Sequence, residues 1–191
     1  MNNYENSNHY PRFTYERRIL WSQGDSESNC HWLPWLQKQL IINGVLAQTP
    51  EMPAPYNPTY PEWKEMLERF DLNEDTILMG HSCGGGFILR YLSEENVKVG
   101  KVILVAPWID SENFLNTGMF DFTFDEHVVS KTKGVTIFES TNDDEEIKKS
   151  IQIILDKVPD VNIKTFVDYG HFCFRNMKTR EFPELLQECL L

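Results

Sequence analysis

The segment Gly80-His81-Ser82-Cys83-Gly84 is the part of the sequence that most directly suggests covalent chemistry. The pattern G-x-S-x-G is typical of a nucleophilic serine on a sharp turn between a strand and a helix. The backbone of such a turn is strained, and we expect glycines on both sides because side chains there would collide. The pattern therefore predicts that Ser82 attacks an acyl carbonyl. The N–H of Cys83, at the start of the helix, would stabilise the oxyanion.

His171 is the histidine best placed to take the proton of Ser82. It follows the last predicted strand, and the serine pattern expects the chain order serine, acid, histidine. The other histidines lie in an N-terminal arm, at the start of a helix, inside the serine turn and in a long connection (His9, His31, His81 and His127). These positions suit a base less well.

Two neighbouring aspartates, and a third further away, could orient His171. Asp143 and Asp144 follow the strand that lies between the serine and the histidine in the chain. Either could face the histidine while the other caps the next helix. Asp110 follows an earlier strand, which is one strand too early for the usual arrangement. The residues alone leave the choice between Asp143 and Asp144 open.

A second oxyanion donor should come from the loop after the first predicted strand. That loop contains Gln23, Gly24 and Asp25. We expect the donor to be the backbone N–H of Asp25, although the same residues also suit an ordinary turn.

These candidates follow predicted strands in a chain where strands and helices alternate. The predicted strands cover residues 19–21, 45–47, 76–79, 101–106, 135–138 and 163–167. Five helices are predicted. Three of them cover about 31–42, 147–158 and 181–190. A fourth contains Trp63, Leu67 and Phe70, and a fifth runs from the serine turn to about residue 93. Residues 49–61 contain five prolines and are predicted as a loop. The alternation indicates a mostly parallel sheet with helices on both faces. Ligands of such sheets bind beyond the carboxyl ends of the strands.

Two features follow the serine turn. Gly85 and Gly86 continue the glycine run into the predicted helix, where each glycine costs about 1 kcal/mol relative to alanine, so we expect tight backbone packing there. The connection 107–131 is rich in aromatic residues, namely Trp108, Phe114, Phe120, Phe122 and Phe124. We expect most of them to pack in the core, although some could roof an apolar acyl pocket.

The 191 residues suit one domain, predicted over 17–191 after a mobile arm at 1–16. The chain has 18 basic and 29 acidic residues and a net charge of -11. A negative chain gains nothing from counterion release on nucleic acid and is repelled by anionic membranes, so we expect neither partner.

The cysteines, Cys30, Cys83, Cys173 and Cys189, form no C-x-x-C pair and no zinc-like cluster with histidine. This usage indicates free thiols and a cytoplasmic protein. The N-terminus lacks the apolar core of a signal peptide, and no apolar run has the length of a membrane span. Cys83 and Cys173 flank the candidate site but have no obvious base, so neither is predicted as a nucleophile.

Several segments together resemble the small serine hydrolases typified by retinoblastoma-binding protein nine. They are HWLPWLQKQL at 31–40, MPAP at 52–55, ILMGHSCGG at 77–85, KVILVAPW at 101–108, FESTNDD at 138–144 and GHF at 170–172. The combination of the serine turn with S-T-x-D and G-H-F is the most specific part. The resemblance implies a single-domain α/β-hydrolase fold without a large cap domain.

The resemblance also implies a triad of Ser82, Asp143 and His171. It favours Asp143 over Asp144 because Asp143 stands three residues after Ser140, as the acid of the family follows its own serine turn. The expected activity is hydrolysis of a small ester or amide through an acyl-serine intermediate, without metal or organic cofactor. The alternative is a binding protein that keeps the fold without turnover. The retinoblastoma-pocket motif L-x-C-x-E is absent, so that partner is not implied, and no other protein partner is identified.

Overall fold

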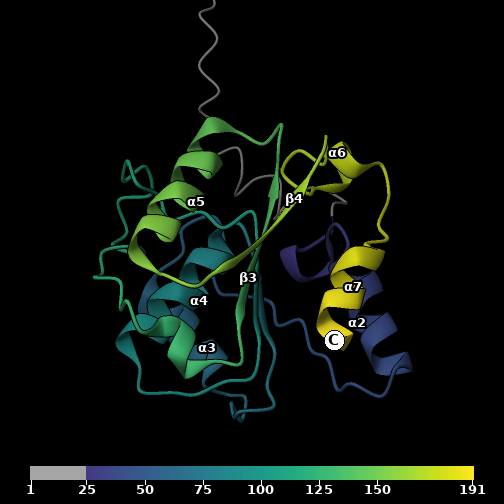
Figure 1. Cartoon of the computed structure of the whole chain (residues 1–191), viewed down its shortest axis with the longest axis horizontal. Coiled ribbons are helices and arrows are strands. Elements are labelled where there is room, and N and C mark those ends of the chain that lie inside the picture. The colour runs from purple at the N-terminus through teal and green to yellow at the C-terminus, as the bar shows by residue number, and fades with distance from the viewer. Residues whose placement is uncertain (1–24) are drawn as a thin grey trace, which may run out of the picture.

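The computed structural model of the chain describes residues 25–191 (Figure 1). The predicted arm at 1–16, the predicted strand at 19–21, and Gln23 and Gly24 lie outside the described residues.

The described residues form a central sheet of four parallel strands in the order β1-β2-β3-β4. The strands are β1 (Leu78–His81), β2 (Val102–Val105), β3 (Val135–Ser140) and β4 (Asn162–Phe166). Val102 of β2 pairs with Leu78 of β1 and with Val135 of β3. Every residue of β2 is buried, as expected for a strand that is covered on both faces.

Helices cover both faces of the sheet (Figure 1). One face carries α3 (Tyr60–Leu67), α4 (Cys83–Glu94) and α5 (Glu145–Lys157), and the other carries α2 (Leu33–Ile42) and α7 (Pro183–Leu190). Short turns of helix cover Glu27–Asn29, Val128–Lys131 and, as α6, Phe174–Met177. No helix within residues 25–191 has the length and apolar character needed to cross a membrane.

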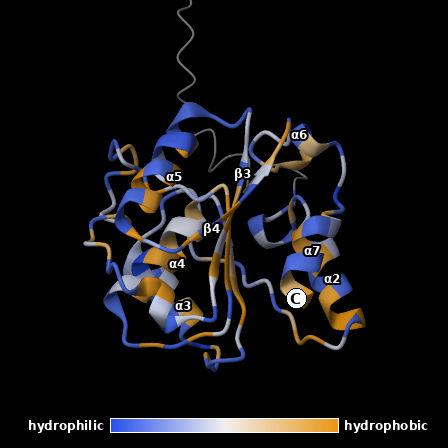
Figure 2. Cartoon of the chain, in the orientation of Figure 1, coloured by the Kyte–Doolittle hydropathy of each residue, from blue (hydrophilic) through white to orange (hydrophobic). Residues whose placement is uncertain are grey.

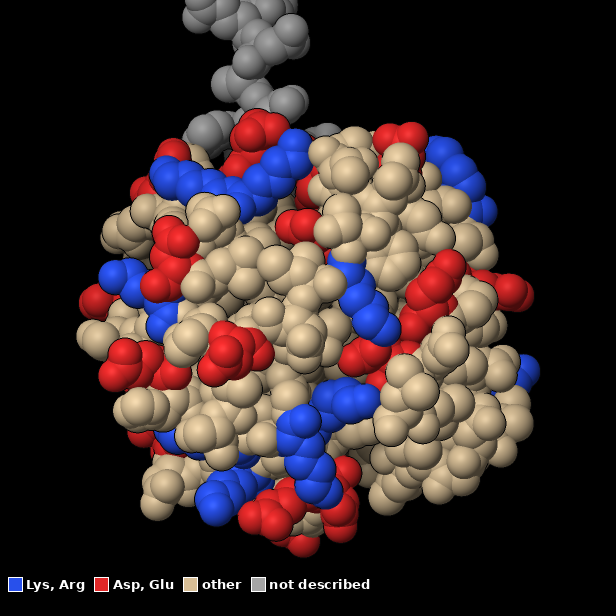
Figure 3. Space-filling model, in the orientation of Figure 1, with Lys and Arg blue, Asp and Glu red and all other residues tan. Residues whose placement is uncertain are grey.

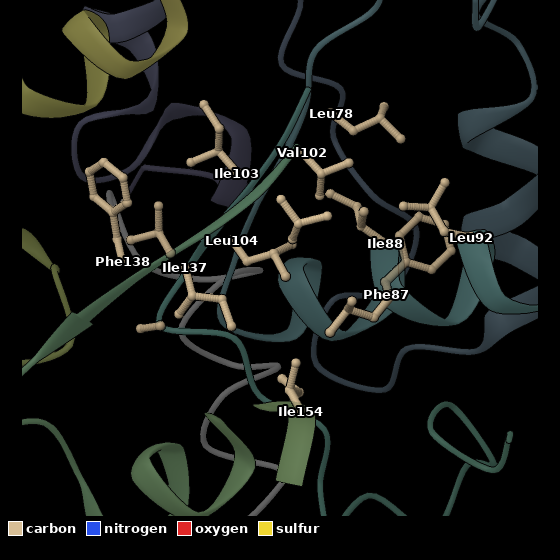
Figure 4. Packing of buried hydrophobic residues seen from close by; sticks show 14 of the residues in the cluster. Leu78, Phe87, Ile88, Leu92, Val102, Ile103, Leu104, Ile137, Phe138 and Ile154 are labelled. Atoms are coloured by element: carbon tan, nitrogen blue, oxygen red, sulfur yellow. The ribbon is translucent and has the colours of Figure 1, made fainter. Parts of the chain in front are cut away.

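The core lies where the strands meet these helices. Figure 2 shows hydrophobic residues along the strands, and Figure 4 shows side chains of alternating strand positions on opposite sides. Leu104 lies on the side of Ile88 and Phe87 of α4, whereas Ile103 lies on the other side with Phe138 (Figure 4). Acidic and basic side chains are interspersed on the surface seen in Figure 3.

The structure corrects the sequence-based expectation at two segments. Residues 45–47 were predicted as a strand but form none, and Leu46 is 86% exposed. A strand needs a hydrogen-bonded neighbour, and no strand of the described residues pairs with this segment. Helix α3 ends at Leu67 rather than reaching Phe70, whose N–H bonds in a turn to the carbonyl of Leu67. The other predicted elements within the described residues are confirmed, with their ends shifted by a few residues.

The tight packing expected at Gly85 and Gly86 is confirmed. A Cβ atom on Gly85 would lie 2.9 Å from the Cβ of Pro107, and one on Gly86 would lie 2.1 Å from the backbone oxygen of Trp108. The glycines therefore let α4 lie directly against the chain that leaves β2.

This packing predicts a difference between two glycines of the same helix. We expect Gly86→Ala to lower the free energy of unfolding by about 1–3 kcal/mol, because the added methyl group meets a backbone oxygen that cannot move alone. A Cβ on Gly84 meets nothing within 4 Å, so Gly84→Ala should leave stability unchanged or raise it slightly. Urea unfolding of both variants tests this, and equal stability of Gly86→Ala and the wild type would contradict it.

Candidate active site

Ser82 lies on the turn between the end of β1 and the start of α4. Its backbone has φ 51° and ψ −119°, a conformation that side-chain-bearing residues rarely adopt. Its N–H donates to the carbonyl of Val105 at 2.9 Å. Its carbonyl accepts the N–H of Trp108 at 3.0 Å and, at the start of α4, those of Gly85 at 2.9 Å and Gly86 at 3.3 Å. The strained turn that the sequence predicts is present, and β2 and the chain after it fix its position.

Gly80 and Gly84, the two glycines of the G-x-S-x-G pattern, differ in the space around them. A Cβ on Gly80 would lie 2.4 Å from the backbone of Gly84, so a side chain at position 80 would collide with the first turn of α4. Gly84 itself has open space around its Cα among the described residues. The expected crowding is therefore confirmed for Gly80 and wrong for Gly84.

His171 meets Asp143 at the carboxyl ends of β3 and β4. Nδ1 of His171 lies 3.1 Å and 3.2 Å from the two carboxylate oxygens of Asp143. The side chain of Asp143 is 1% exposed and that of His171 is 18% exposed. An ionised carboxylate only accepts hydrogen bonds, so this contact favours the tautomer with the hydrogen on Nδ1, which leaves Nε2 of a neutral ring without one.

Asp144 and Asp110, the two other candidates, have other positions. Asp144 is exposed at the N-cap position of α5, where its carbonyl accepts the N–H of Ile147, but its side chain makes no capping bond. The expected side-chain cap is therefore wrong, because the carboxylate faces solvent. Asp110 is buried, and its carboxylate accepts the N–H groups of Phe114 and Leu115 at 2.7 Å and 2.9 Å. It holds its own loop rather than a histidine.

The side chains of residues 140–143 each bind one residue of the loop at 168–171. The side chains of Ser140, Thr141 and Asn142 accept backbone N–H groups of Tyr169 at 3.0 Å, Asp168 at 3.3 Å and Gly170 at 2.7 Å, respectively. Asp143 completes the set through the His171 ring. The S-T-x-D pattern is the sequence signal for this contact, in which the serine and threonine take part as well as the predicted aspartate.

His81 connects the serine turn to the His171 loop. Its Nε2 lies 2.9 Å from the carbonyl oxygen of His171, and the two imidazole centroids are 4.9 Å apart. Because His81 directly precedes Ser82, this contact brings the candidate nucleophile and base into one neighbourhood. Sequence reasoning set His81 aside as a base and missed this contact.

Cys83 has a backbone N–H at the start of α4 and a thiol whose ionisation is suppressed. Helix α4 begins at Cys83, so its N–H is one of the amides without an intrahelical partner. Burial raises the pKa of the Cys83 thiol well above its ordinary value, and the charge of Asp110 raises it further. The thiol is therefore protonated near neutral pH. All four cysteines are free thiols, as predicted.

The expected second donor, Asp25, is not placed at Ser82 by any hydrogen bond of the described residues. Its carboxylate is exposed and accepts a hydrogen bond from Arg180 at 2.6 Å. Within residues 25–191, no three His, Cys, Asp or Glu side chains gather in a way that could hold a metal ion.

None of the five aromatic residues expected to pack in the core after β2 is fully buried, so that expectation is met only in part. Trp108, Phe120 and Phe124 pack against the buried cluster, whereas Phe114 is 50% exposed. The ring of Trp108 meets that of Phe120 at 5.8 Å, and its Nε1 donates to Glu146 at 2.5 Å.

Comparison with known proteins identifies the family of this chain. Residues 21–172 match the family described as serine hydrolase. The chain is 30% identical over 128 residues to the putative hydrolase YdeN of Bacillus subtilis, a match that covers 62% of this chain and 66% of that protein. It is 29% identical over 162 residues to the serine hydrolase RBBP9 of Rattus norvegicus, which covers 82% and 83%.

Solved structures agree with these matches. The crystal structure of the ydeN gene product of B. subtilis superposes with a TM-score of 0.76 at 25% identity and covers 85% of this chain and 90% of that one. The methylesterase MES16 of Arabidopsis superposes with a TM-score of 0.52 at 14% identity over 80% of this chain and 90% of that one, a likeness of fold alone. The expected single-domain α/β-hydrolase fold is confirmed, and the match over most of its length shows that this chain belongs to the serine hydrolase family.

Proposed function

We propose that the chain hydrolyses a small ester or amide through an acyl-serine intermediate on Ser82. The observation that carries this proposal is the bond between Nδ1 of His171 and the buried carboxylate of Asp143. That bond leaves the other ring nitrogen as the base. The strained turn at Ser82 and the contact of His81 with the His171 loop support the same assignment.

The reaction uses each group in turn. Ser82 Oγ attacks the acyl carbon while His171 Nε2 takes its proton, and the N–H of Cys83 stabilises the oxyanion. When the tetrahedral intermediate collapses, His171 returns the proton to the departing alcohol or amine. A water molecule then attacks the acyl-serine, again losing its proton to His171, and the acid leaves as Ser82 regains its hydrogen. Asp143 keeps Nδ1 protonated throughout and stabilises the imidazolium.

Two further assignments belong to this proposal. The backbone N–H of Asp25 would be the second oxyanion donor, since the family's serine turn calls for one from the loop after the first strand. The four free thiols support a reducing, cytoplasmic location.

The first prediction tests the nucleophile. Wild-type protein should react with a fluorophosphonate probe at Ser82 and turn over members of a panel of p-nitrophenyl esters and aminoacyl amides. Ser82→Ala should lose both, because removal of the nucleophile costs on the order of 10⁶-fold in kcat in well-studied serine enzymes. Ser130→Ala, at an exposed serine, is the control. Folded wild-type protein that neither labels nor turns over would favour the alternative, a binding protein on this fold.

The second prediction separates the neighbouring aspartates. Asp143→Asn should lower kcat by up to about 10⁴-fold, because the amide favours the wrong histidine tautomer. Asp144→Asn should leave kcat nearly normal, and it should change stability little because the carboxylate makes no capping bond. Steady-state kinetics and thermal unfolding of both variants measure this, and an inactive Asp144→Asn beside an active Asp143→Asn would reverse the assignment.

The third prediction concerns pH. kcat/KM should fall on the acid side of the profile, because a histidine that acts as a base must be neutral. The raised pKa of Cys83 keeps its thiolate scarce, so the rate should not climb on the alkaline side where ordinary thiols ionise, near about pH 8.5. A profile that rises there, or one that is flat on the acid side, contradicts the assignment of roles.

A further inference from the structure

Three ring nitrogens bind the backbone of the chain that carries His171. His81 Nε2 lies 2.9 Å from the carbonyl oxygen of His171, Trp32 Nε1 donates to the carbonyl of Phe172 at 3.1 Å, and His31 Nδ1 accepts the N–H of Phe174 at 3.3 Å. We call the side chains of His31, Trp32 and His81 the ring clamp.

The rings of the clamp also pack on one another. The ring of His81 meets those of Trp32 and His31 edge-on, each at a centroid distance of 5.8 Å, and it lies 4.9 Å from that of His171. Trp32 is 1% exposed. These residues come from separate segments, the entry to α2 and the end of β1, so only the folded chain brings them together.

The hydrogen bond of His31 requires a neutral ring, whereas that of His81 requires only a hydrogen on Nε2. A carbonyl only accepts, so His81 carries its hydrogen on Nε2, and a backbone N–H only donates, so Nδ1 of His31 carries none. Burial lowers the pKa of His31, against a smaller opposing effect of the Glu27 carboxylate. Burial also holds the pKa of His81 well below its ordinary value, and the nearby His171 lowers the pKa of both rings further. The clamp therefore stays uncharged beside His171 near neutral pH.

The bound loop is strained and needs such support. Asp168, Gly170 and Phe172 have φ values of 62°, 53° and 52°. For an aromatic residue such as Phe172 this conformation is unfavourable, and it persists only where the surroundings hold it. Phe172 is 0% exposed, and the clamp bonds its carbonyl, the carbonyl of His171 and the N–H of Phe174.

We propose that His31, Trp32 and His81 are positioning residues that hold His171 in register with Ser82. Residues 140–143 bind the loop at 168–171, and the ring clamp binds it at 171–174, so His171 is the residue that both sets share. This proposal rests on the proposed function, in which His171 is the base. The clamp touches backbone, so its loss should misplace the base and lower kcat while substrate binding, read as KM, changes little.

A matched pair of tryptophan variants tests the proposal. Trp32→Phe removes the Nε1 bond to the loop but keeps an aromatic ring. Trp63→Phe removes an equivalent bond elsewhere, because Trp63 is 5% exposed and its Nε1 donates to the carbonyl of Pro53 at 2.8 Å. We expect Trp32→Phe to lower kcat on the order of tenfold, with KM within about twofold, and to speed hydrogen–deuterium exchange in residues 170–177. Trp63→Phe should change neither.

A second set of variants tests the donor at position 81. His81→Phe keeps a ring without a donor and should lower kcat by at least about tenfold, whereas His81→Gln keeps an N–H group and should recover part of that loss. The proposal is overturned if Trp32→Phe and His81→Phe match Trp63→Phe in kcat and in exchange of residues 170–177, or if His81→Gln is no better than His81→Phe. A wild-type chain without turnover would remove the proposed function, and the exchange of residues 170–177 would still decide whether the rings hold the loop.

Discussion

A histidine can serve as the base of a serine only if one ring nitrogen keeps its hydrogen and the other lacks one. In this chain the bond between Nδ1 of His171 and the carboxylate of Asp143 meets that constraint. Asp143 can do this because it is almost fully buried and lies three residues after the end of β3, the strand beside β4. The parallel sheet thus brings together two residues that are far apart in the chain.

The backbone is strained at Ser82 and in the loop at 168–172, and several elements of the fold hold these two segments in place. Positive φ values at Ser82 and Phe172 cost free energy, and hydrogen bonds from neighbouring elements hold both residues. Val105 and Trp108 hold the serine turn, while residues 140–142 hold the start of the histidine loop. The elements that bury the core therefore also set the positions of Ser82 and His171.

Much of this arrangement could be predicted from the sequence, because strand and helix periodicity and the G-x-S-x-G pattern are local signals. Expectations failed where the outcome depends on pairing or side-chain orientation that no local pattern encodes. Residues 45–47 have strand-like side chains but no paired strand among the described residues, and the Asp144 carboxylate faces solvent instead of capping α5. His31 and His81 have no signal of their own, since their role depends on the meeting of rings from distant segments. Asp25 and the first predicted strand stay predictions.

The tautomer of His171 tests the central claim most directly. Two-dimensional ¹⁵N–¹H NMR of the histidine rings, recorded above the pH at which His171 becomes neutral and assigned by comparison with His171→Gln, reports which nitrogen carries the hydrogen. The account predicts hydrogen on Nδ1 and a bare Nε2 in the wild type, with this preference lost in Asp143→Asn. A neutral His171 with its hydrogen on Nε2 in the wild type would contradict it, because that ring could not take the proton of Ser82.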